Sequence, residues 1–242
     1  MPVKGKYNLL DWDSKKFGYQ IASVRPHEIK LKDLQALIEE LKNNNFKLAY
    51  LFVNPDDATS NKSLFKVCGY IADEKVTFVT EIKQPDDFGH SSSISPFKLN
   101  HTSEKLRFLA LQSGIYSRFN VDNNFVNNEY EQLYTEWIDK SVKKELADEI
   151  LVYYKDDEEK GFITLAFKEG FGSIGLVAVD EKERGNSIGK ELMKAALWTF
   201  KENGVHTVEV VTQKANRIAC AFYKSLGFKV GKVENIYHLW IK

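Results

Sequence analysis

The alternation of apolar and polar positions from residue 174 onward predicts strands and helices that follow one another in turn. Residues 174–179 form a short apolar run of the strand type, and residues 180–183 form a charged turn. Apolar residues then recur at the three- and four-residue spacing of a helix; they are Ile188, Leu192, Met193, Ala196, Leu197 and Phe200. A strand at 206–211, a helix that ends at 222–228 and a last strand through 239–241 complete the pattern.

The segment before residue 174 carries further periodic patterns. Helices are predicted over about 102–114 and 127–144, followed by a hairpin whose strands cover 147–155 and 161–168. The second helix has an apolar stripe, typical of a surface that faces the core, made of Tyr130, Leu133, Tyr134, Trp137 and Ile138. The order is therefore two helices, three strands, helix, strand, helix, strand, which predicts an α/β (α+β) fold.

The order of strand, helix, glycine and strand occurs twice, in residues 47–82 and again in 206–241. In both copies a glycine, Gly69 or Gly227, ends the helix, as expected for a left-handed cap, and an aromatic residue follows it. We interpret the repeat as an internal duplication, although the same order is also common in unrelated α/β proteins.

Differences between the two copies predict which one is active. Four residues before the glycine stand Tyr223 in the second copy and Phe65 in the first, and only the tyrosine carries a transferable proton. We therefore predict a degenerate half over 1–85, kept as scaffold and for substrate enclosure. A linker over 86–100, rich in serine, leads to the catalytic domain over 101–242.

Composition narrows the class of protein. The 242 residues are 43% hydrophobic and 28% charged, which is typical of a globular chain with one large or two small domains. Basic and acidic residues number 34 each, without a basic stripe, so no nucleic acid is expected as a partner. We find no signal peptide and no apolar run of transmembrane length, which predicts a cytoplasmic protein without membrane contact. Cys68 and Cys220 lie in apolar helical surroundings and are expected to be reduced and without chemistry.

The segment from Arg184 to Lys190 has the pattern of a phosphate-binding turn. It follows a predicted strand and opens a predicted helix, so its backbone N–H groups are the unpaired donors of a helix N-terminus. Such donors, together with the positive end of the helix dipole, bind phosphate well. The alternative is a surface turn that only starts a helix.

This turn resembles the R-x-x-G-x-G/A signature of the GCN5-related N-acetyltransferase (GNAT) family. Arg184 and Gly189 match the ends of the signature, and Ser187 replaces its middle glycine. The resemblance implies a GNAT fold with a mixed, mostly antiparallel sheet, preceded by a degenerate GNAT-like half, and acetyl-CoA as cosubstrate, without a metal. The residues that the resemblance assigns to its diphosphate arm are Arg184, Gly185, Asn186, Ser187, Ile188, Gly189 and Lys190. The pantetheine arm would add like a strand along the backbone of Val177, Ala178 and Val179.

Two polar residues of the last predicted helix have counterparts in the family. Asn216 and Tyr223 stand seven residues apart, so both side chains face the same way on a helix. The resemblance implies that Asn216 contacts the cofactor and that Tyr223 also contacts it and protonates the leaving thiolate. The alternative for Tyr223 is a core aromatic residue. Residues 174–179 contain no carboxylate that could act as a general base, and Glu209 or Asp122 are weaker candidates for that role.

The missing general base favours an acceptor amine with a lowered pKa. Lysine, near pKa 10.4, is almost wholly protonated at neutral pH, whereas about a tenth of an amine near pKa 8 is neutral. Amino sugars have such amines, and the patches at 10–18 and 117–119 resemble GNAT enzymes that acetylate nucleotide-linked amino sugars for polysaccharide biosynthesis. By this resemblance Arg118 would bind the diphosphate, with a surface ion pair as the alternative. Tyr116 or Phe119 would stack on the base or sugar.

We therefore predict an acetyl-CoA-dependent N-acetyltransferase that acts on a nucleotide-linked 4-amino-4,6-dideoxy sugar by direct attack in a ternary complex. Two alternatives remain open. One is an acetyltransferase of the same fold for a protein N-terminus, an amino acid or a polyamine. The other is a non-catalytic module that binds acyl-CoA or a nucleotide sugar. The oligomeric state is open, although strand edges in this fold often pair, which would give a homodimer.

Overall fold

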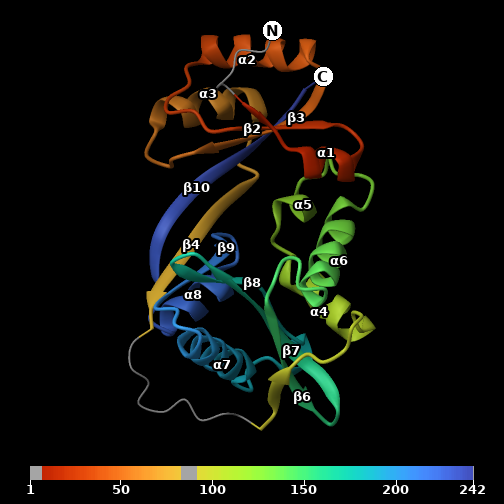
Figure 1. The fold of residues 1–242 in the computed structure, drawn as a ribbon. Coiled ribbons are helices and arrows are strands. Elements are labelled where there is room, and N and C mark those ends of the chain that lie inside the picture. Colours follow the sequence, from red (N-terminus) through yellow and green to blue (C-terminus); the bar gives the residue numbers. More distant parts are fainter. Residues whose placement is uncertain (1–6, 83–91, 242) are drawn as a thin grey trace. The chain divides into compact units, whose positions relative to one another are not determined.

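The computed structural model describes residues 7–82 and 92–241, which divide between two compact units (Figure 1). The first unit takes the chain up to Val76, Gln213–Ala215 and the end of the chain from Lys232, and the second takes Thr77–Thr212 and Asn216–Gly231. The helices are α1 (Asp11–Phe17), α2 (Leu31–Asn43), α3 (Ala58–Cys68), α4 (Glu104–Ser113), α5 (Arg118–Val121), α6 (Glu129–Val142), the 3-10 turn η1 (Glu181–Glu183), α7 (Ile188–Glu202) and α8 (Arg217–Ser225). The strands are β1 (Asn8–Leu9), β2 (Gln20–Val24), β3 (Phe46–Val53), β4 (Asp73–Glu81), β5 (Ile94–Pro96), β6 (Glu149–Lys155), β7 (Glu158–Lys168), β8 (Phe171–Val179), β9 (Thr207–Gln213) and β10 (Lys229–Trp240).

The first unit is built on a pair of parallel strands that stay hydrogen-bonded along the length of the shorter strand. Strands β2 and β3 pair in parallel from Ile21 opposite Leu48 to Val24 opposite Leu51, and helix α2 connects them. The C-terminal part of β10 pairs antiparallel with the other edge of β3. Helices α2 and α3 lie side by side over this sheet (Figure 1) and bury their apolar side chains against it, among them Leu34, Leu37, Leu41 and Leu64.

Helices α3 and α8 are each followed by a left-handed glycine, as the sequence predicts. Asp57 caps α3 by accepting a hydrogen bond from the Ser60 N–H at 3.0 Å, and the helix ends at Gly69 with φ +82°. Gly227, just after α8, has φ +86°. Both glycines therefore adopt the left-handed conformation that we predicted for them, which a residue with a Cβ adopts only at a cost.

The second unit has a mixed, mostly antiparallel sheet, as the family resemblance implied. Strands β5, β6, β7 and β8 run antiparallel in succession, and β9 pairs in parallel with β8. Helices α4 and α6 cover one face, where Leu106, Leu109, Ala110 and Ile138 join a buried cluster with residues of β6, β7 and β8. Helix α7 packs on β7 and β8 with five of the six apolar positions predicted from its spacing. These five are at most 2% exposed, namely Ile188, Leu192, Met193, Ala196 and Phe200, whereas Leu197 is half-buried.

The borders of the units differ from the predicted domain borders. The chain from Lys232 belongs with the first unit, because this part of β10 pairs with β3, and β4 contributes Thr77–Glu81 to the second unit. Within the predicted linker, residues 86–91 lie outside the described residues, whereas 94–96 form β5, paired with β6. Over the two described ranges, each helix is too short or too polar to cross a membrane.

Candidate functional site

The parallel strands β8 and β9 pair over only part of their length. Their register runs from Gly172 opposite Val208 to Ile174 opposite Val210, and β8 continues to Val179 without a further partner residue on β9. A shift in register between β7 and β8 lies next to this point. There the Thr164 Oγ1 accepts a hydrogen bond from the Leu176 N–H at 2.8 Å. The second half of β8 therefore has an open edge on the side of β9. In the first unit, by contrast, β2 stays paired with β3 as far as Val24.

The peptide groups that face this open edge follow from the hydrogen bonds on the other side of β8. The N–H groups of Leu176 and Asp180 both point toward β7, to Thr164 Oγ1 and to the Lys160 carbonyl, each at 2.8 Å. Because successive residues of a strand direct their peptide groups to opposite sides, Val177 and Val179 direct theirs toward β9. The edge thus offers N–H and C=O groups to an added strand-like group at Val177 and Val179, whereas the peptide groups of Ala178 face β7.

A turn with two left-handed residues connects the end of β8 to helix α7. Gly185 has φ +87° and Ser187 has φ +63°, and Ser187 is the N-cap of the 15-residue helix. Its side chain makes no capping hydrogen bond, and the residue is exposed. A left-handed position explains why the family signature has glycine there, and serine adopts it at a cost of about 1–2 kcal/mol. The N–H groups of such a turn, at a helix N-terminus, form a concave site for an anion.

Arg184 and Gly189 hold the two sides of this turn. The Arg184 Nε donates to the Val179 carbonyl at 3.3 Å, which folds the exposed side chain back along the end of β8. A Cβ on Gly189 would lie 3.4 Å from the Phe222 ring and 3.6 Å from a Val179 methyl group, so this glycine lies at the packed side of the turn.

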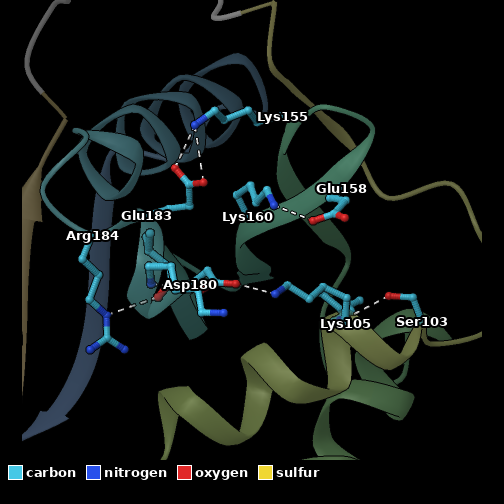
Figure 2. Close-up of polar contacts among 11 residues, drawn as sticks. Ser103, Lys105, Lys155, Glu158, Lys160, Asp180, Glu183 and Arg184 are labelled. Carbon is cyan, nitrogen blue, oxygen red and sulfur yellow. Dashed lines mark hydrogen bonds and ion pairs between the residues drawn. The ribbon is translucent and has the colours of Figure 1, made fainter.

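Ion pairs that the sequence analysis missed brace the turn (Figure 2). Lys105 of α4 pairs with Asp180, whose Oδ1 also accepts a hydrogen bond from the Lys182 N–H at 3.0 Å. The Lys105 hydrogen bond is the main reason why the pKa of Asp180 lies below its ordinary value. Lys155 of β6 pairs with Glu183 at 3.1 Å. Sequence gives no signal for these pairs, because their members are 75 and 28 positions apart.

The two residues predicted to contact the cofactor lie at helix α8, Asn216 at its start and Tyr223 within it. Asn216 is the N-cap of the helix and not part of it, and its Oδ1 accepts a hydrogen bond from the Ala219 N–H at 3.1 Å. Tyr223 is 5% exposed, and its ring lies 5.6 Å from Phe78 and 5.9 Å from Phe228. Burial raises the pKa of Tyr223, so its hydroxyl is protonated at any ordinary pH. In the first unit the matching Phe65 is 56% exposed.

The predicted acceptor residues lie around the short helix α5. Ser117 caps it, and the Arg118 guanidinium lies 4.6 Å above the Phe119 ring. Phe119 is 6% exposed and packs on Phe125 and Trp137, with ring centroids 5.5 and 6.3 Å away, so its ring is part of the packing of α5 on α6. Tyr116 is half-buried.

The two weaker candidates for a general base are Asp122 and Glu209. Asp122 is 2% exposed and accepts hydrogen bonds from both the backbone and side-chain nitrogens of Asn124, at 3.0 and 2.7 Å. Glu209 lies on β9 opposite Ser173, within the paired part of the two strands.

The two cysteines have raised pKa values. The pKa of Cys68 is raised to about 12 by burial, and burial also raises that of Cys220, so both thiols are protonated near neutral pH.

Known proteins resemble this chain in sequence and in fold. Residues 114–228 match the model of the acetyltransferase (GNAT) family. Mycothiol acetyltransferase of Thermobispora bispora is 35% identical over 66 residues, which is 27% of this chain and 22% of that protein. N-alpha-acetyltransferase 30 of Homo sapiens is 36% identical over 73 residues, or 30% of this chain and 20% of that protein. The chain thus spans about a fifth of the length of these curated relatives.

The similarity in fold extends over almost the whole chain. The crystal structure of a GCN5-related N-acetyltransferase from Sphaerobacter thermophilus has a TM-score of 0.62 at 15% identity and covers 98% of this chain and 76% of that one. Residues 114–228 are thus similar to the GNAT family of acetyltransferases, and the chain has a mixed α/β fold like that of the GNAT structure.

Proposed function

We propose that this protein transfers an acetyl group from acetyl-CoA to an amine. The observation that carries the proposal is the open edge of β8, which is followed directly by the left-handed turn at the start of α7. The edge suits a chain with amide groups, and the turn suits the diphosphate next to it. Pantetheine and diphosphate occur in this order in coenzyme A.

The residues of the turn would bind the diphosphate through backbone N–H groups of Gly185, Asn186, Ser187, Ile188, Gly189 and Lys190. Arg184 and Lys190 are both exposed and add positive charge at this end of the helix. The peptide groups of Val177 and Val179 would hydrogen-bond the pantetheine arm. Ala178, whose peptide groups face β7, would contribute only packing there.

Tyr223 is our proton donor for the leaving thiolate. Its raised pKa keeps the hydroxyl in the donor form, although it also makes the hydroxyl a weaker acid. A thiolate released into the same poorly solvated surroundings is a stronger base than in water, and this favours proton transfer from the more weakly acidic Tyr223 hydroxyl. No carboxylate occurs in 174–179, and we propose that the acceptor amine loses its proton to water.

For the acceptor, we propose a nucleotide-linked amino sugar of the dTDP-4-amino-4,6-dideoxyhexose type, as for dTDP-fucosamine acetyltransferase. The support is the sequence resemblance in the patches at 10–18 and 117–119 and the amine of lowered pKa that the missing base favours. Arg118 would bind the sugar nucleotide diphosphate, and the half-buried Tyr116 is better suited to stacking than Phe119, whose ring is enclosed.

A protein N-terminus is a second candidate acceptor. Its α-amino group also has a pKa near 8, and a relative with 36% identity is named for N-alpha-acetylation. The amine chemistry therefore does not separate the two candidates.

The test is release of free thiol from acetyl-CoA with three sets of acceptors: dTDP-4-amino-4,6-dideoxyhexoses, peptides with free N-termini, and polyamines. Turnover with the first set alone supports the amino-sugar proposal, and turnover with peptides alone replaces it. Binding of acetyl-CoA without turnover in every set would leave a non-catalytic module.

The role of Tyr223 has a separate test in Tyr223→Phe, which keeps the ring and its packing. We expect kcat to fall at least tenfold while the Kd for acetyl-CoA changes less than threefold. Unchanged kcat would exclude Tyr223 as the donor.

A further inference from the structure

Two ion pairs from different elements converge on the short segment between β8 and the phosphate turn (Figure 2). Lys105 reaches Asp180 at the start of this segment, and Lys155 reaches Glu183 at its end. Asn186 of the turn itself donates from its side-chain nitrogen to Glu183 at 3.4 Å. The segment that leads into the turn is therefore held from α4 on one side and from β6 on the other.

The Asp180 pair is the better enclosed of the two. The Asp180 side chain is 8% exposed, and the residue both caps η1 and donates its N–H to β7 through the Lys160 carbonyl at 2.8 Å. The Lys105 side chain is 32% exposed, compared with 50% for Lys155. Lys105 is the direct ion-pair partner of this buried carboxylate, and the charge of Lys160 acts on it more weakly. Removing the direct partner should still be costly, because it leaves most of the buried charge uncompensated.

Lys105 is itself held in place near the start of α4. Ser103 caps this helix by accepting a hydrogen bond from the Leu106 N–H at 2.9 Å. The Ser103 Oγ donates in turn to Glu159 on β7 at 2.8 Å. The lysine thus extends from a fixed helix start, anchored to the same strand that receives the Asp180 N–H.

We propose that Lys105 is a positioning residue for the diphosphate end of the cosubstrate. This inference rests on the proposed function, since it needs a diphosphate on the turn. Lys105 fixes Asp180 and thereby the entry into Arg184 and Gly185. It also neutralises a carboxylate that would otherwise lie close to the bound anion and repel it.

The proposal predicts an effect that depends on the diphosphate of the donor. Acetyl-pantetheine carries the thioester and the amide arm of acetyl-CoA but has no diphosphate. We expect Lys105→Met to raise the KM for acetyl-CoA about tenfold with kcat within twofold. The KM for acetyl-pantetheine, with the same acceptor, should stay within twofold of the wild-type value. Lys105→Arg should restore most of the acetyl-CoA affinity, because it returns the charge.

A second substitution separates the charge effect from a loss of packing. In the Lys105→Met background, Asp180→Asn removes the unpaired carboxylate and should recover part of the affinity for acetyl-CoA. The matched control is Lys140→Met, which breaks the 2.8 Å Lys140–Glu136 pair on α6 at a lysine that is about as exposed as Lys105, and should leave both KM values unchanged. If Lys105→Met fails to fold, Lys155→Met tests the other pair, with an expected rise of about threefold for acetyl-CoA only.

Each outcome decides between the proposals. Equal KM changes for acetyl-CoA and acetyl-pantetheine, or no change for either, overturn the role of Lys105 and leave the proposed function standing. A wild-type protein that fails to bind acetyl-CoA overturns the proposed function and this inference with it. A selective rise for acetyl-CoA that Lys105→Arg reverses supports both.

Discussion

Gly172 of β8 is a position where a single added methyl group should clearly destabilise this fold. A Cβ built there would lie 2.5, 2.6 and 3.0 Å from three carbons of the Phe200 ring. Phe200 is fully buried in α7 and also contacts the Phe167 ring, at 5.4 Å between centroids, so it has no free space to move into. Overpacking of this kind costs about 2 kcal/mol. The better strand propensity of alanine returns about 0.5 kcal/mol, which leaves a loss of about 1.5 kcal/mol for Gly172→Ala.

A double-mutant cycle measured by urea unfolding with circular dichroism tests this reasoning. Phe200→Leu alone should cost about 1–1.5 kcal/mol. Adding Gly172→Ala to it should cost less than about 0.5 kcal/mol, because leucine lacks the ring carbon Cε1 and its flexible side chain can turn the remaining carbons away from the methyl group. Gly189→Ala serves as the control, since its Cβ would have only ordinary contacts, and it should be neutral or slightly stabilising. Additive losses in the double mutant would refute the packing argument.

Three further predictions concern the turn and the thiols. Ser187→Val should lower the free energy of unfolding by about 1 kcal/mol or more, because a β-branched residue is strained in the left-handed region. Ser187→Gly should change it by less than about 0.5 kcal/mol, because the relief of left-handed strain is offset by the greater freedom of the unfolded chain. Urea unfolding checks both values, and a neutral Ser187→Val would contradict the reasoning. The folded pKa of Asp180 is lowered below 3.8, so its stabilising contribution is complete above that pH and lost as the pH falls below it. The stability gap between wild type and Asp180→Asn should therefore be widest near neutral pH and shrink below about pH 4, and a gap independent of pH would argue against the pair. Cys68, with its pKa raised to about 12, should resist iodoacetamide at pH 8 until urea unfolds the protein, as followed by mass spectrometry; rapid labelling of the folded protein would contradict the raised pKa.

The sequence predicted most of the second unit because its elements are periodic and well bounded. The apolar spacing of α7 gave its buried face, and the glycines after α3 and α8 gave their left-handed ends. The short helix α5 and the strand β5 escaped prediction, since neither is long enough to show a period. Asn216 was expected on the helix and is its N-cap, an error of one residue that changes the role of its side chain.

The sequence by itself determined the turn between β8 and α7, the order of the elements around it and the tyrosine that follows, because each depends on residues close together in the chain. Only the tertiary structure decided where β8 and β9 part, and it alone showed that Lys105 and Lys155 brace the turn. It also showed that Phe119 is enclosed and that β10 ends in the first unit. These features depend on contacts between distant segments. The sequence of a strand indicates that one of its faces is buried, but it does not indicate which strand will pair with its edge.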